Sequence, residues 1–138
     1  MSFLLDTNAV SEWVKPQPNP GLIHWMEAAD EDRIFISVAS LAELHYGVQR
    51  LAPGTRRRRI EQWLRHDLPL RFENRILPVS SDVAEAWGRT VASNEAVGRP
   101  IGVIHAFLAA TAEIHNLTLV TRNVSDFPLV KAILNPWS

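Results

Sequence analysis

The chain has 138 residues, of which 46% are hydrophobic and 21% charged, as expected for one soluble globular domain with an adequate core. Its formal net charge of −1 excludes a surface that attracts nucleic acid everywhere, so any such contact must be local. The absence of cysteines excludes disulfides and thiolate metal sites, and it fits a reducing compartment.

No apolar run reaches the roughly 18 residues that a membrane-spanning helix needs. The first ten residues, MSFLLDTNAV, have neither a basic region nor an apolar stretch of signal length, so we expect no export. Repeats, low-complexity segments and linkers are also missing from the sequence. We therefore expect a single domain over residues 1–138, located in the cytoplasm and without a membrane partner.

Short apolar runs alternate along the chain with longer segments in which apolar residues have helical spacing. In chain order, the pattern predicts a strand at 3–5, helices at 6–14 and 22–29, a strand at 34–36, helices at 40–51 and 56–68, a strand at 76–79, a helix from 80–82 to 98–100, a helix at 102–115, a strand at 117–120 and a weakly marked strand at 132–134. This alternation is typical of an α/β fold with a mostly parallel sheet and helices on both faces.

In such sheets ligands bind beyond the carboxyl ends of the strands, so the polar residues there are the candidate site residues. Asp6 follows the first strand, Glu43 lies early in the helix after the second, and Asn123 and Asp126 follow the fourth. Each has a local alternative, since Asp6 can cap a helix, Glu43 can be a solvated or capping residue, and the last two can stabilise a turn.

Taken together, these residues would place three carboxylates and one amide at one edge of the sheet. Clustered carboxylates repel one another unless a cation neutralises them, and oxygen ligands suit Mg²⁺ or Mn²⁺. Such an ion lowers the pKa of a bound water and holds a phosphate. The chemistry indicated is metal-assisted hydrolysis of phosphodiesters.

Four segments resemble the motif blocks of one family: LLDTNAVSE, SVASLAELHYGV, GRPIGVIHAFLAATA and LTLVTRNVSDF. They look like the PIN-domain ribonucleases and, more narrowly, the VapC and FitB-type toxins of bacterial toxin–antitoxin pairs. The resemblance runs from Phe3 to Phe127 and depends on the order and spacing of the blocks together. It implies a three-layer α/β/α sandwich and a Mg²⁺- or Mn²⁺-dependent endoribonuclease, commonly acting on tRNA or rRNA. It also implies homodimers and hetero-oligomers with a cognate antitoxin.

The resemblance assigns roles residue by residue. Asp6 would ligate the metal, and Glu43 would ligate it or orient its water. Asn123 and Asp126 match the last block, where the family has one or two acidic residues that bind the metal or hold its water shell. The third acidic position falls on His105, where the family's block has aspartate.

His105 is the one clear departure from the motif, and it would replace an anionic oxygen ligand by an imidazole. Imidazole suits Zn²⁺, Ni²⁺ or Cu²⁺ better than Mg²⁺, and beside Asp6 and Glu43 it would tend to be protonated and ion-paired with them. Three interpretations remain open: an inactivated nuclease that keeps the fold, an active variant with altered metal preference, or an ordinary histidine outside the site. The first also allows a non-catalytic PIN-fold module that binds antitoxin or RNA without cutting.

The densest basic stretch is Arg56, Arg57, Arg58 and Arg59 at the start of a predicted helix. It is either a solvated helix face, balanced by Glu61 and Asp67, or an edge that contacts RNA phosphates without reading sequence.

Overall fold

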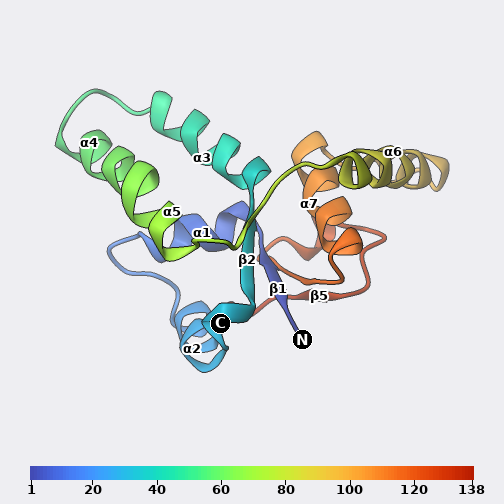
Figure 1. Ribbon diagram of the computed structural model, residues 1–138, viewed down its shortest axis with the longest axis horizontal. Helices are drawn as coiled ribbons and strands as arrows, with labels where there is room; N and C mark the ends of the chain where they lie inside the picture. Colours follow the sequence, from blue (N-terminus) through green and yellow to red (C-terminus); the bar gives the residue numbers. More distant parts are fainter.

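The computed structural model describes all 138 residues and contains one five-stranded sheet between helices (Figure 1). Every pair of neighbouring strands is parallel, and the order across the sheet is β3-β2-β1-β4-β5. The strands are β1 (Phe3–Leu5), β2 (Ile34–Ser37), β3 (Ile76–Leu77), β4 (Thr118–Val120) and β5 (Ile133–Leu134). The predicted α/β fold with a parallel sheet is confirmed, including its weakly marked last strand.

The helices lie close to their predicted positions. They are α1 (Thr7–Trp13), α2 (Pro20–Ala28), α3 (Val38–Gln49), α4 (Thr55–Gln62), α5 (Leu68–Arg71), α6 (Ser81–Ala96) and α7 (Val103–Ile114). Short 3₁₀ turns occupy Glu31–Arg33 and Val124–Asp126. None of these helices combines the length and the apolar character that crossing a bilayer requires.

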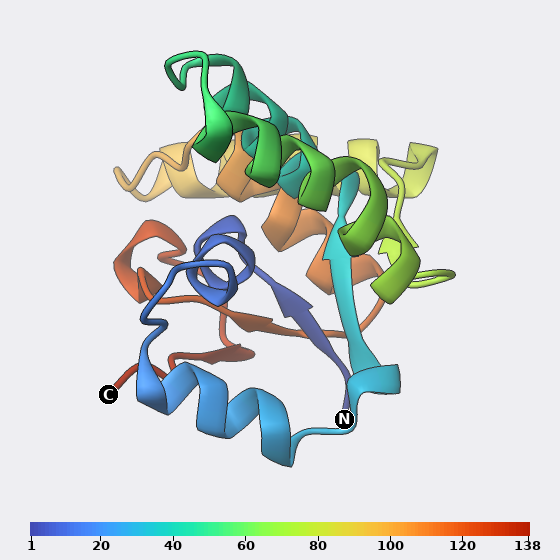
Figure 2. The ribbon, with the colours of Figure 1, turned by 90° about the vertical axis from the view of Figure 1, so that its left-hand side faces the viewer.

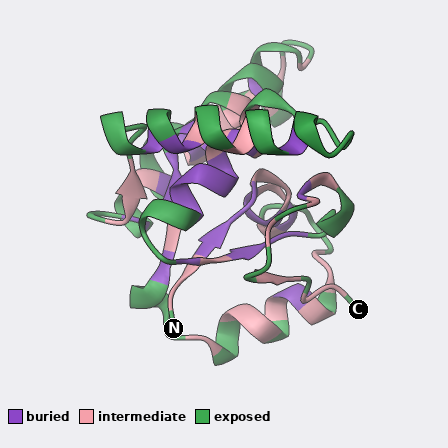
Figure 3. Cartoon of the chain, turned by 90° about the vertical axis from the view of Figure 1, so that its right-hand side faces the viewer, coloured by how far each residue is buried: buried purple, intermediate pink, exposed green.

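The three layers follow from the alternation of side chains along the strands. Leu5 of β1 faces a core that includes buried residues of α1, α2 and α3 and the helical segment from α4 to Phe72. Its neighbour Leu4 faces the opposite core, built mainly on α7. Beyond α7, the helix α6 is exposed along its outer face, as Figure 3 shows. The sandwich implied by the resemblance is therefore present.

Two predicted elements were wrong in extent, and a proline accounts for each. The helix expected at 56–68 divides into α4, a π-helical turn at Trp63–Asp67, and α5. Pro69 has no N–H to donate to the carbonyl of Arg65, which favours this widened turn. The strand expected at 76–79 ends at Leu77, because Pro78 cannot continue the ladder.

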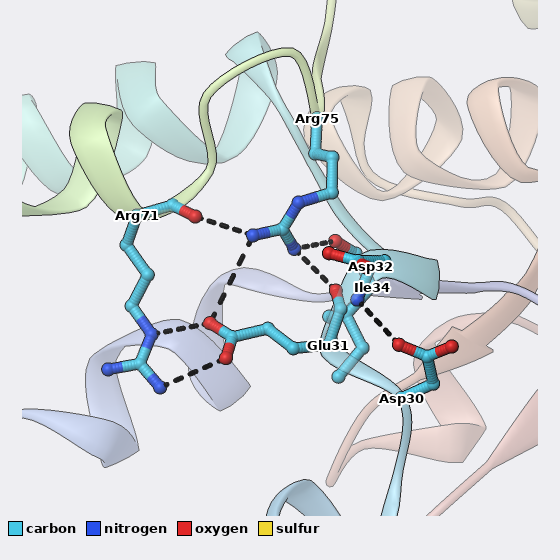
Figure 4. Close-up of polar contacts among 6 residues, drawn as sticks. All are labelled: Asp30, Glu31, Asp32, Ile34, Arg71 and Arg75. Atoms are coloured by element: carbon cyan, nitrogen blue, oxygen red, sulfur yellow. Dashed lines mark hydrogen bonds and ion pairs between the residues drawn. The ribbon is translucent and has the colours of Figure 1, made fainter.

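Arg75 fixes the outer edge of the sheet to the end of α5 (Figure 4). Its guanidinium donates to the backbone carbonyls of Glu31, Ile34 and Arg71. The side chain of Glu31 pairs in turn with Arg71 at 2.6 Å. Only 14% of the Arg75 side chain is exposed, so its guanidinium is held close against these carbonyls. The contacts hold β2 and β3 in place and, with them, the start of α3.

Glu12, at the end of α1, anchors the proline-containing segment before α2. Its Oε1 pairs with Lys15 Nζ and its Oε2 accepts from the backbone N–H of Asn19, both at 2.8 Å. The bond from Lys15, aided by that of Asn19, lowers the pKa of Glu12 below its usual 4.5 in spite of burial. Ionised Glu12 therefore stabilises the fold above pH 4.5, and this contribution is lost as the pH falls through its lowered pKa.

We expect Glu12→Gln to reduce the free energy of unfolding by about 1 kcal/mol at neutral pH. The difference from the parent chain should disappear well below pH 4.5, where Glu12 is protonated. Urea denaturation at both pH values measures this. As a control, Glu61→Gln removes the i,i+4 ion pair with Arg65. It should change the free energy of unfolding by about 0.3–0.5 kcal/mol. A deficit of equal size at both pH values would contradict the assignment.

Candidate active site

The central strand β1 carries Asp6 to the middle of the carboxyl edge of the sheet. Asp6 is 3% exposed, and it caps α1 through a 2.6 Å hydrogen bond from the N–H of Thr7 to its Oδ1. Its Oδ2 accepts from the hydroxyl of Thr121 at 2.7 Å and from the Asn8 amide at 3.3 Å. The sequence offered helix capping and a place in the polar cluster as alternatives for Asp6. In the structure Asp6 does both.

Burial raises the pKa of Asp6 above its usual value, because it disfavours the charged form. The hydrogen bonds from Thr121 and Thr7 lower the pKa in part, as does the nearby His105, while Glu43 raises it. Asp6 is therefore a carboxylate whose negative charge is costly to keep, held in place by donors from three residues, Thr7, Asn8 and Thr121.

Glu43 lies on α3 and meets Asp6 through a shared residue, Thr7. Thr7 Oγ1 lies 2.5 Å from Glu43 Oε1 and 3.0 Å from Ser40 Oγ. A carboxylate only accepts hydrogen bonds, so the Thr7 hydroxyl donates to Glu43 and accepts from Ser40. One threonine therefore links both predicted acidic residues, through its backbone N–H to Asp6 and its side chain to Glu43.

His105 lies in the first turn of α7 and forms the opposite side of the cluster. Its Nε2 is 3.9 Å from Asp126 Oδ2, and its ring packs 4.9 Å from that of Phe127. The expected ion pairs with Asp6 and Glu43 are absent, because the imidazole is turned toward Asp126 instead. Through Asp126, His105 nevertheless belongs to the same edge of the sheet as Asp6.

Asp126 ends the 3₁₀ turn after β4, and Asn123 is the residue just before this turn. The N–H of Asn123 donates to Thr121 Oγ1 at 3.0 Å, and its carbonyl accepts from the N–H of Asp126. Asn123 is exposed, and its hydrogen bonds are made by its backbone. The Asn123 side chain does not cap the turn, and Asp126 contacts the cluster through His105.

Four residues of the cluster were not predicted: Thr7, Asn8, Ser40 and Thr121. Thr121 is fully buried and orders the edge, since it accepts from Asn123 and donates to Asp6. A usable signal was present, because Thr7 and Thr121 stand at the same place as the acids, just beyond β1 and β4.

The side chains do not fit a metal site built from three acids. No three of the acidic and histidine side chains lie close enough to hold one ion together. Both oxygens of Asp6 already accept hydrogen bonds, and the imidazole of His105 faces Asp126. A hard cation would find two linked carboxylates here and a nitrogen ligand that it does not prefer.

Comparison with known proteins places this geometry in a family. The sequence model of the PIN-domain family matches residues 3–131, which include four of the five strands and all the helices. The chain belongs to the PIN-domain family. This PIN domain is 33% identical over 136 residues to the toxin FitB of Neisseria gonorrhoeae, covering 98% of both chains. It is 30% identical to the VapC ribonuclease Y4jK of Sinorhizobium fredii, covering 98% of this chain and 97% of that protein.

The solved structures agree with the sequence relatives. The structure of FitAB bound to an IR36 DNA fragment contains a chain that superposes on this PIN domain with a TM-score of 0.90. The two are 31% identical, and the match covers 99% of this chain and 96% of that one. The predicted resemblance to VapC and FitB-type toxins is confirmed.

Proposed function

We propose that this PIN domain is the toxin of a type II toxin–antitoxin pair, built as a Mg²⁺- or Mn²⁺-dependent endoribonuclease, and that His105 impairs hydrolysis in this copy. The observation that carries the proposal is the edge cluster itself. Asp6 and Glu43 are joined by Thr7, and a histidine stands where the family has its third acid. The names of the relatives, a toxin and a ribonuclease, support the assignment.

Each residue of the cluster has a proposed role. Asp6 and Glu43 are the acids that would hold the metal, and Asp126, with Asn123 beside it, belongs to the outer part of the site. A bound divalent ion supplies a nucleophilic water and neutralises charge on the phosphate. With His105 in place, the imidazole would offer no third anionic ligand, so the ion would bind weakly.

The proposed partners are RNA of the tRNA or rRNA class and a cognate antitoxin. The proposed location is the cytoplasm. The chain is proposed to form a homodimer and to assemble with its antitoxin into a hetero-oligomer. Assembly with an antitoxin is supported by the structural match to a toxin–antitoxin complex from Klebsiella pneumoniae. Sedimentation of the chain alone and with its antitoxin tests both states.

The function is tested by incubating tRNA and rRNA with the chain and with His105→Asp, in the presence of Mg²⁺, Mn²⁺ or a chelator. Metal-dependent cleavage that is strong only for His105→Asp supports an impaired ribonuclease. Cleavage by neither chain would refute the enzyme assignment.

A second function is favoured by the same histidine: a non-catalytic PIN module that binds antitoxin or RNA without cutting. Its signature would be binding by the parent chain together with no cleavage under any metal. The two candidates differ in whether restoring the aspartate restores hydrolysis, because a module that had also lost other parts of the site would stay inactive.

A further inference from the structure

A pocket of about 540 Å³ lies between the middle of α6, the second half of α7 and the segment that leads into β5. No residue of the edge cluster belongs to its lining. Figure 2, viewed from the side of α4, shows α6 at the back of the molecule, and Figure 1 shows the two helices on opposite sides of the sheet. The pocket is therefore separate from the candidate active site.

The pocket contains a buried hydrogen-bond acceptor that no group of the protein uses. Asn94, on α6, lines the pocket and is 1% exposed. Its Nδ2 donates to the carbonyl of Thr90 at 2.8 Å, whereas its Oδ1 receives no hydrogen bond from the protein. Buried amide oxygens are nearly always paired, because leaving one without a donor is unfavourable. A ligand that brings an N–H group to Asn94 would satisfy this oxygen.

Charged and amide side chains complete the polar part of the lining. Lys131 takes part in none of the ion pairs of the structure, and Arg89 is shared between Glu85 at 3.2 Å and Glu113 at 3.8 Å. Because Glu113 is the one acid of the lining, positive charge is in excess there. Asn116, just beyond α7, adds an exposed amide. The pocket can therefore receive an anionic group together with a group that exchanges hydrogen bonds with an amide.

We propose that this pocket binds an adenine mononucleotide, with its phosphate at Lys131 and the polar edge of its base toward Asn94 and Asn116. An asparagine amide matches adenine, because its oxygen accepts from the amino group of the base and its nitrogen donates to N7. Asn94 would turn outward from Thr90 to meet the base. The inference is independent of the proposed ribonuclease function, since the pocket shares no residue with the edge cluster.

The size and the apolar part of the pocket favour a nucleotide. Its volume lies within the roughly 300–1,000 Å³ of small-ligand pockets, which is more than a phosphate ion alone fills. An acidic peptide would also bring N–H groups and negative charge. Its backbone carries a carbonyl at every residue, however, and the apolar lining offers these no donors. The faces of an adenine ring need no such partners and can pack on Ala109, Ala112 and Leu129.

The experiment is a titration of the ¹⁵N-labelled chain, followed by NMR, with AMP, adenosine and inorganic phosphate as separate probes. We expect AMP to shift the side-chain amides of Asn94 and Asn116, and to bind at least about tenfold more tightly than either fragment. Lys131→Gln should weaken AMP about tenfold and leave adenosine within about twofold, because one charge-assisted hydrogen bond to the phosphate is lost. Lys15→Gln, the same change at the chain's other lysine, should leave the AMP affinity within about twofold.

The contact with the base is tested by Asn94→Leu, which keeps a similar volume and removes the acceptor. AMP and adenosine should both lose about tenfold in affinity. If this variant does not fold, Asn116→Gly gives the same comparison at an exposed position, where glycine suits the φ of 54°. Wild-type affinity for adenosine in the folded variant would contradict the proposed contact.

Three results would overturn the inference as a whole. The first is no binding of AMP, or shifts confined to the edge cluster. The second is equal affinity for AMP and inorganic phosphate, which would make the pocket a site for anions alone. The third is an equal effect of Lys15→Gln and Lys131→Gln. Tighter binding of an acidic peptide than of AMP at the same amides would likewise reject the nucleotide as the occupant.

Discussion

Replacing His105 with aspartate is expected to produce RNA cleavage that depends on Mg²⁺ or Mn²⁺ and exceeds that of the parent chain by about 100-fold or more. Metal stabilisation of charge in the transition state is worth several kcal/mol, and about 1.4 kcal/mol corresponds to a factor of ten in rate. The new carboxylate would replace the imidazole that now faces Asp126 Oδ2 at 3.9 Å. The carboxylates of Asp6, Glu43 and the new aspartate would then border one site from two sides.

Two matched variants separate charge from shape. His105→Asn removes the imidazole without adding a carboxylate, so it should remain inactive. His115→Asp makes the same change of residue type at the C-terminal end of α7, away from the cluster, and should behave like the parent. Binding of Mn²⁺, followed by calorimetry, should tighten only in His105→Asp. This readout does not depend on the choice of RNA.

The outcome distinguishes the interpretations of His105. If the parent chain cleaves as fast as His105→Asp when Zn²⁺, Ni²⁺ or Cu²⁺ replaces Mg²⁺, the histidine is a ligand of an altered metal site. If it cleaves as fast with Mg²⁺ itself, the impairment proposed here is wrong. The structure already places His105 beside Asp126 and Phe127, at the edge of the sheet rather than in a core remote from the acids.

The sequence predicted the position of the site because parallel strands give simple rules. β1 is apolar on both faces and ends at Asp6, and its central place in the sheet brings Asp6 near the start of α3, where Glu43 lies. The two acids are 37 positions apart, yet the order of strands and helices alone brings them together. The same rule placed Asp126 after β4.

The contacts between side chains could not be predicted in this way. Whether His105 turns toward Asp6 or toward Asp126 depends on the packing of its ring against Phe127, which no local pattern encodes. The arginines are a similar case. Arg56 to Arg59 form one basic run in the sequence, but the way α4 packs on α3 decides which of them donate to the chain's own oxygens, as Arg57 and Arg58 do.

Thr7 shows what the sequence offered and what was missed. It stands between Asp6 and Asn8 in DTN and reads as part of a helix cap. In the structure its backbone N–H and its hydroxyl serve different acids, Asp6 at 2.6 Å and Glu43 at 2.5 Å. A cap residue can thus also set the separation of two carboxylates, because α3 packs against α1.

Thr7→Val, made in the His105→Asp chain, is expected to lower both Mn²⁺ affinity and RNA cleavage by about 10- to 100-fold, the usual cost of losing a residue that orients a metal ligand. Valine has nearly the shape of threonine and keeps the N–H that binds Asp6, so only the hydroxyl between Glu43 and Ser40 is removed. Glu43 would then be free to rotate away, and Ser40 would lose its acceptor.

The hydroxyl, rather than the volume of the side chain, is tested by Thr7→Ser. Serine can still donate to Glu43, so affinity and cleavage should stay within about threefold of the His105→Asp chain. Urea denaturation of both variants shows that they remain folded, and the ratio of their Mn²⁺ affinities isolates the orienting effect. Equal affinities for valine and serine would mean that Glu43 is held by other contacts of α3. The bridge from Asp6 through Thr7 to Glu43 would then be a structural cap and would not position the acids for a metal.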